Sequence, residues 1–258
     1  MTVKPLLIFD FDGVIIDGLT EYWTSAQRAY LKILGKEYNS NELILNVPKV
    51  FRTLRPWVKD GWEMVLLAAE IHKGKSTLNI SGATAFSNNY SKSCAQALKA
   101  WGWAPEQLQE VLDQVRREVI RSNRDGWLAS HKAFPFVVER IKQLESEGIE
   151  FGVLTTKSAE FTTELLDYLK LQPQLLYGHE SGKKPDILLE ISNKRPITGF
   201  IEDRRTTLET VLKTPALSSI PCYLASWGYL KPQDDKRLPS GMYLLEPKKI
   251  MAPLANWI

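Results

Sequence analysis

The sequence Leu6-Leu7-Ile8-Phe9-Asp10-Phe11-Asp12-Gly13-Val14-Ile15 decides the fold. Its first four residues are all apolar and predict a strand that is buried on both faces. Two carboxylates, Asp10 and Asp12, follow one residue apart, and like charges this close raise each other's pKa unless a cation offsets them. Gly13 then permits a sharp backbone turn. The pattern indicates a carboxylate nucleophile, a second carboxyl group that handles a proton, and a bound divalent cation.

The bulk composition narrows the class of protein. The chain has 258 residues, of which 44% are hydrophobic, which is enough for one large domain or for a core with an insertion. No apolar run reaches the ~18–20 residues that cross a bilayer, and residues 1–5 are too short for a secretory signal. Cys94 and Cys222 lack metal-ligand spacing and predict free, buried thiols of a reducing compartment. The net charge of +3 is too small to indicate a nucleic-acid partner. We therefore expect a cytoplasmic protein with neither a membrane nor a nucleic acid as partner.

Strand and helix patterns alternate through the C-terminal half of the chain. Repeated units of this kind predict an α/β fold, in which helices cover both faces of a parallel sheet. We expect the strand at 6–9 to be central, with 151–155 and 200–201 as its neighbours. Ligands of such sheets bind beyond the carboxyl ends of the strands. The expected strands are 149–155, 175–177, 197–201, 222–225 and an edge strand at 242–245, and the expected helices are 134–147, 159–169, 185–192 and 206–213.

The region between the first strand and the C-terminal half has a different sequence pattern. Helical patterns dominate it, at 21–34, 61–69, 91–100 and 105–121, and no convincing apolar strand interrupts them. The sequence therefore predicts a core domain of residues 1–16 and 131–258, with an all-helical domain inserted at 17–130.

Residues 9–14 resemble the first motif of the haloacid dehalogenase-like (HAD) superfamily, in which apolar residues precede Asp-x-Asp-Gly-Val/Thr. Most members are phosphatases that work through an aspartyl-phosphate. The resemblance implies a Rossmann-like core and makes the helical insertion a C1 cap that closes over the active site. It makes Asp10 the nucleophile and Asp12 the general acid and base. The dehalogenase branch lacks the second aspartate, because a halide needs no proton to leave, so Asp12 favours a phosphate ester.

Two further motifs of the superfamily follow in order. Thr155 ends the strand Phe-Gly-Val-Leu as the second motif does, and the resemblance implies that its hydroxyl binds a phosphoryl oxygen. The amides of Thr156 and Lys157 are further candidates for phosphate binding. The third motif is a lysine ahead of a helix that balances the negative charge. Here two lysines, Lys183 and Lys184, precede Pro185, and aligning the motif's first proline with Pro185 favours Lys184.

The fourth motif normally reads Gly-Asp with another aspartate four residues later. This chain has Glu202 and Asp203, with Thr207 at the later position. The resemblance implies a Mg²⁺ ion held by Asp10, the backbone carbonyl of Asp12 and Asp203, and Mg²⁺ prefers such oxygen ligands. Glu202 is expected to bind the metal through water or to hold one of the two arginines that follow Asp203.

One segment of the insertion is a candidate for substrate recognition. Arg52 and Arg55 lie close to Trp57, in what the sequence predicts to be a turn ahead of an apolar helix. Two guanidinium groups beside an aromatic ring suit a carboxylate or a second phosphate, and Glu63 is placed to order them. The alternative is a basic helix start with Trp57 packed into the core of the insertion.

These observations lead to a Mg²⁺-dependent phosphatase that acts on a small phosphorylated metabolite. Phosphoglycolate phosphatase-like members of the superfamily are the most similar in motif and in the position of the insertion. Two alternatives stay open: a phosphomutase, which shares all four motifs, and a catalytically silent interaction module. The sequence carries no indication of an oligomeric state.

Overall fold

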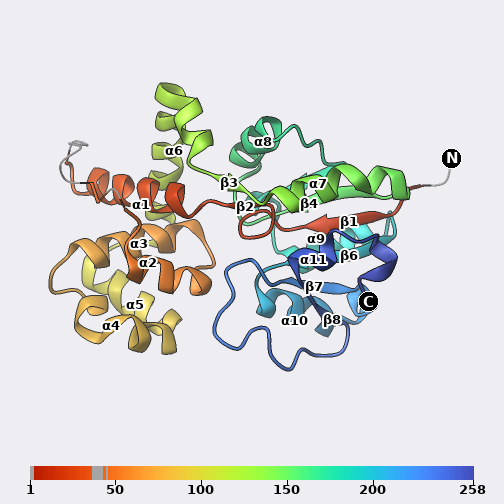
Figure 1. The fold of residues 1–258 in the computed structure, drawn as a ribbon. Coiled ribbons are helices and arrows are strands. Elements are labelled where there is room, and N and C mark those ends of the chain that lie inside the picture. The colour runs from red at the N-terminus through yellow and green to blue at the C-terminus, as the bar shows by residue number, and fades with distance from the viewer. Residues whose placement is uncertain (1–2, 37–42, 45) are drawn as a thin grey trace. The chain divides into compact units, whose positions relative to one another are not determined.

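The computed structural model describes residues 3–36, 43–44 and 46–258, and the chain divides into two compact units (Figure 1). One unit comprises Met1–Asp17 and Lys132–Ile258, and we call it the core unit. The other comprises Gly18–His131, and we call it the helical unit.

The core unit is built on a six-stranded sheet in the order β5-β4-β1-β6-β7-β8. Every pairing in this sheet is parallel. The α/β class and the central position of β1 between β4 and β6 are as the sequence predicts. The strands are β1 (Leu6–Phe9), β4 (Glu150–Leu154), β5 (Leu175–Tyr177), β6 (Ile197–Glu202), β7 (Cys222–Ala225) and β8 (Met242–Leu245).

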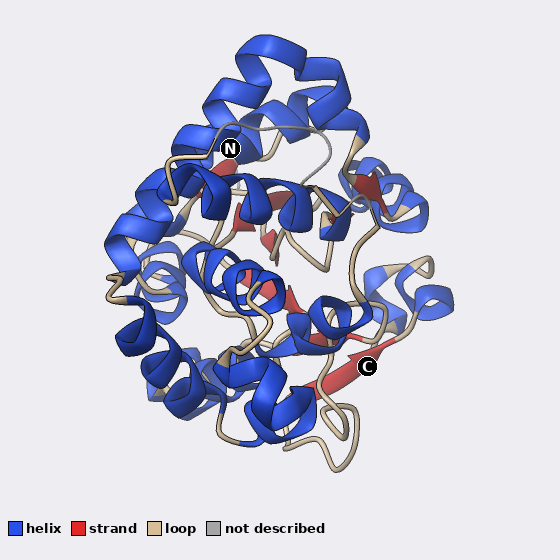
Figure 2. Ribbon diagram, turned by 90° about the vertical axis from the view of Figure 1, so that its left-hand side faces the viewer, coloured by secondary structure: helices blue, strands red, loops and turns tan. Residues whose placement is uncertain are grey.

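Helices cover both faces of this sheet (Figures 1 and 2). Alternate side chains of the central strands, such as Leu6, Ile8 and Phe200, share one hydrophobic cluster with Leu188 and Leu208 of the helices α9 (Lys184–Ser192) and α10 (Arg205–Lys213). The remaining helices of this unit are α7 (Pro135–Gln143), which packs on α11 (Pro247–Ile250), and α8 (Ala159–Tyr168). Because β1 is buried on both faces, it presents polar groups only where it ends.

The helical unit has no strand among its described residues. Its core forms where α1 packs on α3 and α6, and the buried Glu21 of α1 accepts two hydrogen bonds of 2.9 Å from Arg116 of α6. Two of its helices, α2 and α4, are absent from the predicted set. The helices are α1 (Leu19–Ile33), α2 (Lys49–Leu54), α3 (Gly61–His72), α4 (Thr77–Asn88), α5 (Tyr90–Trp101) and α6 (Pro105–Ala129).

A short ribbon carries both passages of the chain between the units. Strand β2 (Ile16–Asp17) pairs antiparallel with β3 (Lys132–Ala133), and Asp17 lies opposite Lys132. The ribbon therefore follows directly from the loop that contains Asp10 and Asp12.

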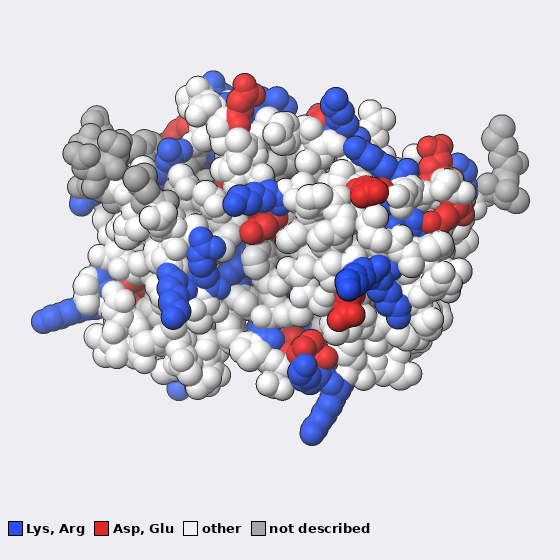
Figure 3. Space-filling view, in the orientation of Figure 1, with Lys and Arg blue, Asp and Glu red and all other residues white. Residues whose placement is uncertain are grey.

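The surface carries charges of both signs. On the face shown in Figure 3 basic and acidic side chains are interspersed, in keeping with the net charge of +3. The two cysteines, Cys94 and Cys222, are free and buried, as predicted. In the part of the chain that the structure describes, each helix is too short or too polar to span a bilayer.

Candidate active site

The site begins where β1 ends. Asp10 directly follows this strand, and its amide donates a 2.8 Å hydrogen bond to the carbonyl of Ile201 on β6. The chain then turns sharply, because the Gly13 amide bonds to the carbonyl of Ile16 at 2.7 Å and Gly13 adopts a φ of 88°. A residue with a Cβ is strained at that angle, which is why glycine is needed here.

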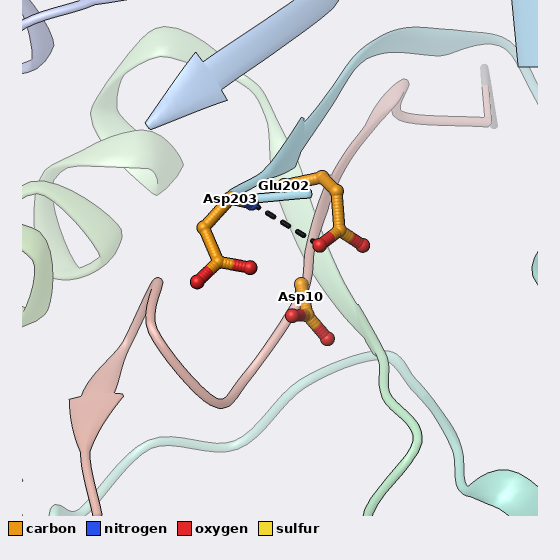
Figure 4. Close-up of side chains that lie close together, drawn as sticks. All are labelled: Asp10, Glu202 and Asp203. Atoms are coloured by element: carbon orange, nitrogen blue, oxygen red, sulfur yellow. Dashed lines mark hydrogen bonds between the residues drawn. The ribbon is translucent and has the colours of Figure 1, made fainter. Parts of the chain in front are cut away.

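Three buried carboxylates meet at this edge of the sheet (Figure 4). One oxygen from each of Asp10, Glu202 and Asp203 can be chosen so that all three lie within 4.8 Å of one another. Glu202 is the last residue of β6, and its Oε1 accepts hydrogen bonds from the amides of Asp203 at 3.1 Å and Arg204 at 3.0 Å. The end of β6 thus folds back on the Glu202 side chain and presents Asp203 beside Asp10.

Lys184 supplies a cation to this cluster. Its Nζ donates hydrogen bonds of 2.7 Å to Asp10 Oδ1 and 2.6 Å to Glu202 Oε2. Lys184 is the first residue of α9, whereas the preceding Lys183 is its N-cap and is exposed. Of the two lysines that the sequence leaves open, the structure brings Lys184 to the carboxylates and leaves Lys183 at the surface.

A second buried lysine lies at Asp12. The Nζ of Lys157 is 3.6 Å from Asp12 Oδ1, and only 1% of its side chain is exposed. The backbone amide of Lys157 donates a 3.1 Å hydrogen bond to the hydroxyl of Thr155, which is itself buried where β4 ends. Thr156, a predicted phosphate contact, is exposed. Sequence reasoning considered only the amide of Lys157 and missed its ammonium group, although its place two residues after Thr155 was the available signal.

Burial controls the protonation of these groups. Burial, the largest cause, and the charge of Glu202 together raise the pKa of Asp10 to about 7, against the lowering effect of Lys184. Burial also raises the pKa of Glu202, again against the effect of Lys184. Burial alone would lower the pKa of Lys184, but Asp10 and Glu202 outweigh it and the pKa is raised. The lysine therefore stays charged, whereas Asp10 and Glu202 keep their protons to a higher pH than ordinary carboxyl groups do.

The donor set fits a divalent cation. Lys157 lies against Asp12, and Lys184 lies against Asp10 and Glu202. With Asp203, which joins Asp10 and Glu202 in one cluster, the four carboxylates exceed these two ammonium groups by two negative charges when all are ionised. Buried carboxylates in excess of their cations are costly unless a metal ion compensates them. The four carboxylate side chains offer hard oxygen ligands, which suit Mg²⁺.

The fourth motif differs in detail from what the sequence suggests. Glu202 holds Lys184 and two backbone amides, and Arg204 meets it through its amide. Arg205 instead bonds Glu209 at 2.8 Å and the carbonyl of Lys236 at 2.7 Å, so it fixes a loop of the core unit. Thr207, at the position of the missing aspartate, is half-buried on α10.

The candidate recognition segment of the helical unit is helical rather than a turn. Arg52 lies on α2, is exposed, and bonds the carbonyl of Val47 through Nε at 3.4 Å. Arg55 is buried, with its guanidinium 5.0 Å above the ring of Tyr22. Glu63 completes a capping box at the start of α3. Arg52 is thus the more accessible of the two predicted substrate contacts.

The chain is similar to known phosphatases in sequence and in fold. No family model matches the chain. A phosphoglycolate phosphatase from Psychrobacter arcticus is 25% identical over 187 residues, which cover 71% of this chain and 65% of that relative, just under two thirds of its length.

Two solved structures share the fold over nearly the whole chain. A predicted phosphatase from Clostridium acetobutylicum aligns with a TM-score of 0.59 at 15% identity, covering 97% of each chain. A haloacid dehalogenase-like family hydrolase from Streptococcus pneumoniae aligns with a TM-score of 0.54 at 15% identity, covering 97% of this chain and 98% of that one. The chain thus has the fold of a haloacid dehalogenase-like family hydrolase and is similar in sequence to a phosphoglycolate phosphatase.

Proposed function

We propose that the protein is a Mg²⁺-dependent phosphatase that hydrolyses a small phosphomonoester through an aspartyl-phosphate on Asp10. The observation that carries the proposal is the contact of Lys184 with both Asp10 and Glu202, at 2.7 and 2.6 Å, inside a buried group of carboxylates. Phosphoryl transfer asks the protein mainly for positioning and charge compensation, and this arrangement offers both.

Asp10 is the nucleophile in the first step. One of its carboxylate oxygens attacks the phosphorus atom, the bond from phosphorus to the ester oxygen breaks, and that oxygen leaves as the alcohol after gaining a proton. In the second step water attacks the phosphorus of the acyl phosphate, which releases inorganic phosphate and restores the Asp10 carboxylate. The covalent intermediate divides one difficult displacement into two easier ones.

Asp12 handles the proton in both steps. It is two residues from Asp10 and partly exposed, so it is accessible to a leaving group and to water in turn. It protonates the departing oxygen and then takes a proton from the attacking water. Lys184 balances the charge shared by Asp10 and the phosphoryl group, and the hydroxyl of Thr155 is a hydrogen-bond donor to that group.

Asp10, Asp203 and the backbone carbonyl of Asp12 would hold the Mg²⁺ ion, with Glu202 at its edge. When bound, the ion neutralises charge on the phosphoryl oxygens and helps to align the ester. The chain's own residues carry the nucleophile, the proton and the second cation. Thus the metal requirement and the identity of the nucleophile are separate, testable parts of the proposal.

The substrate is a small phosphorylated metabolite, and phosphoglycolate is the first compound to test because a curated relative carries that name. Arg52 of the helical unit, exposed on α2, is the proposed contact for a second anionic group of the substrate.

The test is phosphate release from a panel of phosphorylated metabolites, with Mg²⁺ and with EDTA. We expect Mg²⁺-dependent hydrolysis that Asp10→Asn abolishes, because a neutral amide does not attack phosphorus. Normal turnover by Asp10→Asn would contradict the mechanism. A requirement for an added bisphosphate would indicate a phosphomutase, and bound Mg²⁺ without hydrolysis of any ester would indicate the silent module.

A further inference from the structure

The loop that follows β7 is anchored on the candidate active site at several points. The indole Nε1 of Trp227 donates a 3.0 Å hydrogen bond to the carbonyl of Val14, in the loop that follows Asp12. The Trp227 ring also packs edge-on against Phe136, with ring centres 5.1 Å apart. The amide of Tyr229 donates to Asp203 Oδ2 at 2.7 Å. None of these contacts is visible as a motif in the sequence.

The approach of this loop to Asp203 depends on two glycines. A Cβ on Gly228 would lie 2.3 Å from Asp203 Cβ and 2.7 Å from the carbonyl oxygen of Gly13. A Cβ on Gly13 would lie 2.0 Å from Asp203 Oδ2 and 2.8 Å from the ring of Tyr229. Real Cβ atoms do not tolerate such distances, so Asp203 is enclosed between two backbone segments that lack side chains.

The side chain of Tyr229 is also anchored in the core unit. Its hydroxyl donates a 2.5 Å hydrogen bond to Asp17 Oδ1, at the end of β2. A hydrogen bond to an ionised carboxylate is among the stronger ones in proteins. The residue is thus held at both ends, by Asp203 at its amide and by Asp17 at its phenol.

We infer that Tyr229 is a positioning residue for metal binding: it holds the Asp203 carboxylate through its amide and depends on Asp17 for its own placement. This inference rests on the proposed function, because Asp203 is a metal ligand only if the site binds Mg²⁺. A ligand oxygen that is fixed before binding loses little rotamer freedom on binding, and partners of this outer kind orient the ligands of metal sites. Asp17 and Tyr229 therefore contribute to metal binding, although neither residue belongs to the four motifs.

The experiment measures Mg²⁺ affinity calorimetrically on the full chain, for wild type, Tyr229→Phe, Asp17→Ala and the double variant. Loss of an outer partner typically weakens metal binding by about 10-fold or more, so we expect each single variant to raise the Kd for Mg²⁺ by about 10-fold. The double variant should be no weaker than either single one, because both remove the same bond. Asp17→Asn keeps an acceptor and should bind Mg²⁺ nearly as wild type does.

Matched measurements separate positioning from a general loss of structure. Tyr243→Phe removes a hydroxyl from a half-buried tyrosine of β8 and should leave the affinity unchanged. In Tyr229→Phe the KM for the ester at saturating Mg²⁺ should stay at the wild-type value while the half-saturating Mg²⁺ concentration rises.

Wild-type Mg²⁺ affinity in Tyr229→Phe would overturn this inference and leave the proposed function intact. Additive losses in the double variant would overturn the coupling to Asp17. A wild-type protein that binds no Mg²⁺ would overturn both the inference and the metal part of the proposed function. If Tyr229→Phe does not fold, Asp17→Ala decides the same question.

Discussion

Replacing Asp10 by asparagine should stabilise the metal-free core unit, and the gain should grow with pH. Burial raises the pKa of this carboxyl from 3.8 to about 7, so the native state keeps a proton that the unfolded chain has already lost. Folding stability therefore falls as pH rises between those two values, and the penalty is complete above pH 7. A rise of this size corresponds to about 4 kcal/mol at pH 8 but only about 2 kcal/mol at pH 5.

The assay is hydrogen exchange of β1 and β6 peptides in EDTA at pH 5 and pH 8, which reports on the core unit alone. We expect the advantage of Asp10→Asn over wild type to grow by about 2 kcal/mol between the two pH values. Mg²⁺ should reverse the order at pH 8, because it compensates the ionised carboxylate of the wild type. The exposed control Asp167→Asn should show no comparable growth. An advantage that does not change with pH, or a wild type more stable than Asp10→Asn at pH 8, would refute the reasoning.

Three other substitutions, one of them with a matched control at Lys183, test individual parts of the site. Lys184→Met should lower turnover by about 10²-fold or more, because it removes the charge compensation. Lys183→Met, at the exposed N-cap, should stay within about twofold of wild type. Equal losses would mean that the wrong lysine is assigned. Asp12→Asn should slow alkyl phosphates by about 10²-fold or more, and nitrophenyl phosphate far less, since nitrophenolate leaves without a proton; equal slowing would exclude the acid role. Gly13→Ala should abolish Mg²⁺ binding, as measured by calorimetry. The new Cβ would lie 2.0 Å from Asp203 Oδ2, and a φ of 88° would cost alanine about 1–2 kcal/mol. Unchanged affinity would show that this turn does not hold Asp203.

The core unit could be predicted from the sequence because its strands are buried on both faces. Continuous apolar runs such as Leu6–Phe9, each followed by a polar residue, indicate both the strand and the point where it ends. Asp10, Thr155 and Asp203 directly follow three neighbouring strands, so the topology alone brings them to one edge. Parallel strands fix the direction of every carboxyl end, which made this part of the site visible in advance.

The helical unit was harder to predict for physical reasons. α2 has only six residues between Pro48 and Arg55, too few to show a 3.6-residue period. α4 is rich in Ser, Thr and Asn, and at Gly82 its backbone leaves the helical conformation with a φ of 79°. Such a segment has neither a strong helical propensity nor a continuous apolar face, and tertiary packing decides its structure.

The contacts between side chains of different strands and loops could not be predicted from sequence patterns. That Glu202 holds Lys184, that Lys157 is buried beside Asp12, and that Tyr229 bonds Asp203 all depend on contacts between residues far apart in the chain. Periodicity and local spacing describe neighbours along one element, whereas these contacts join different loops. The identity of the motif residues was therefore predictable, but the network that orders them was not.

The central claim is that Asp10 accepts the phosphoryl group covalently. The most direct measurement is to quench the enzyme in acid during turnover of a hydrolysed ester, reduce it with borohydride, and sequence the peptides by mass spectrometry. An acyl phosphate on Asp10 is reduced to homoserine, so we expect homoserine at residue 10, only in the presence of substrate, and none at residue 12. Turnover with no modified residue 10, or with the modification elsewhere, would contradict the mechanism.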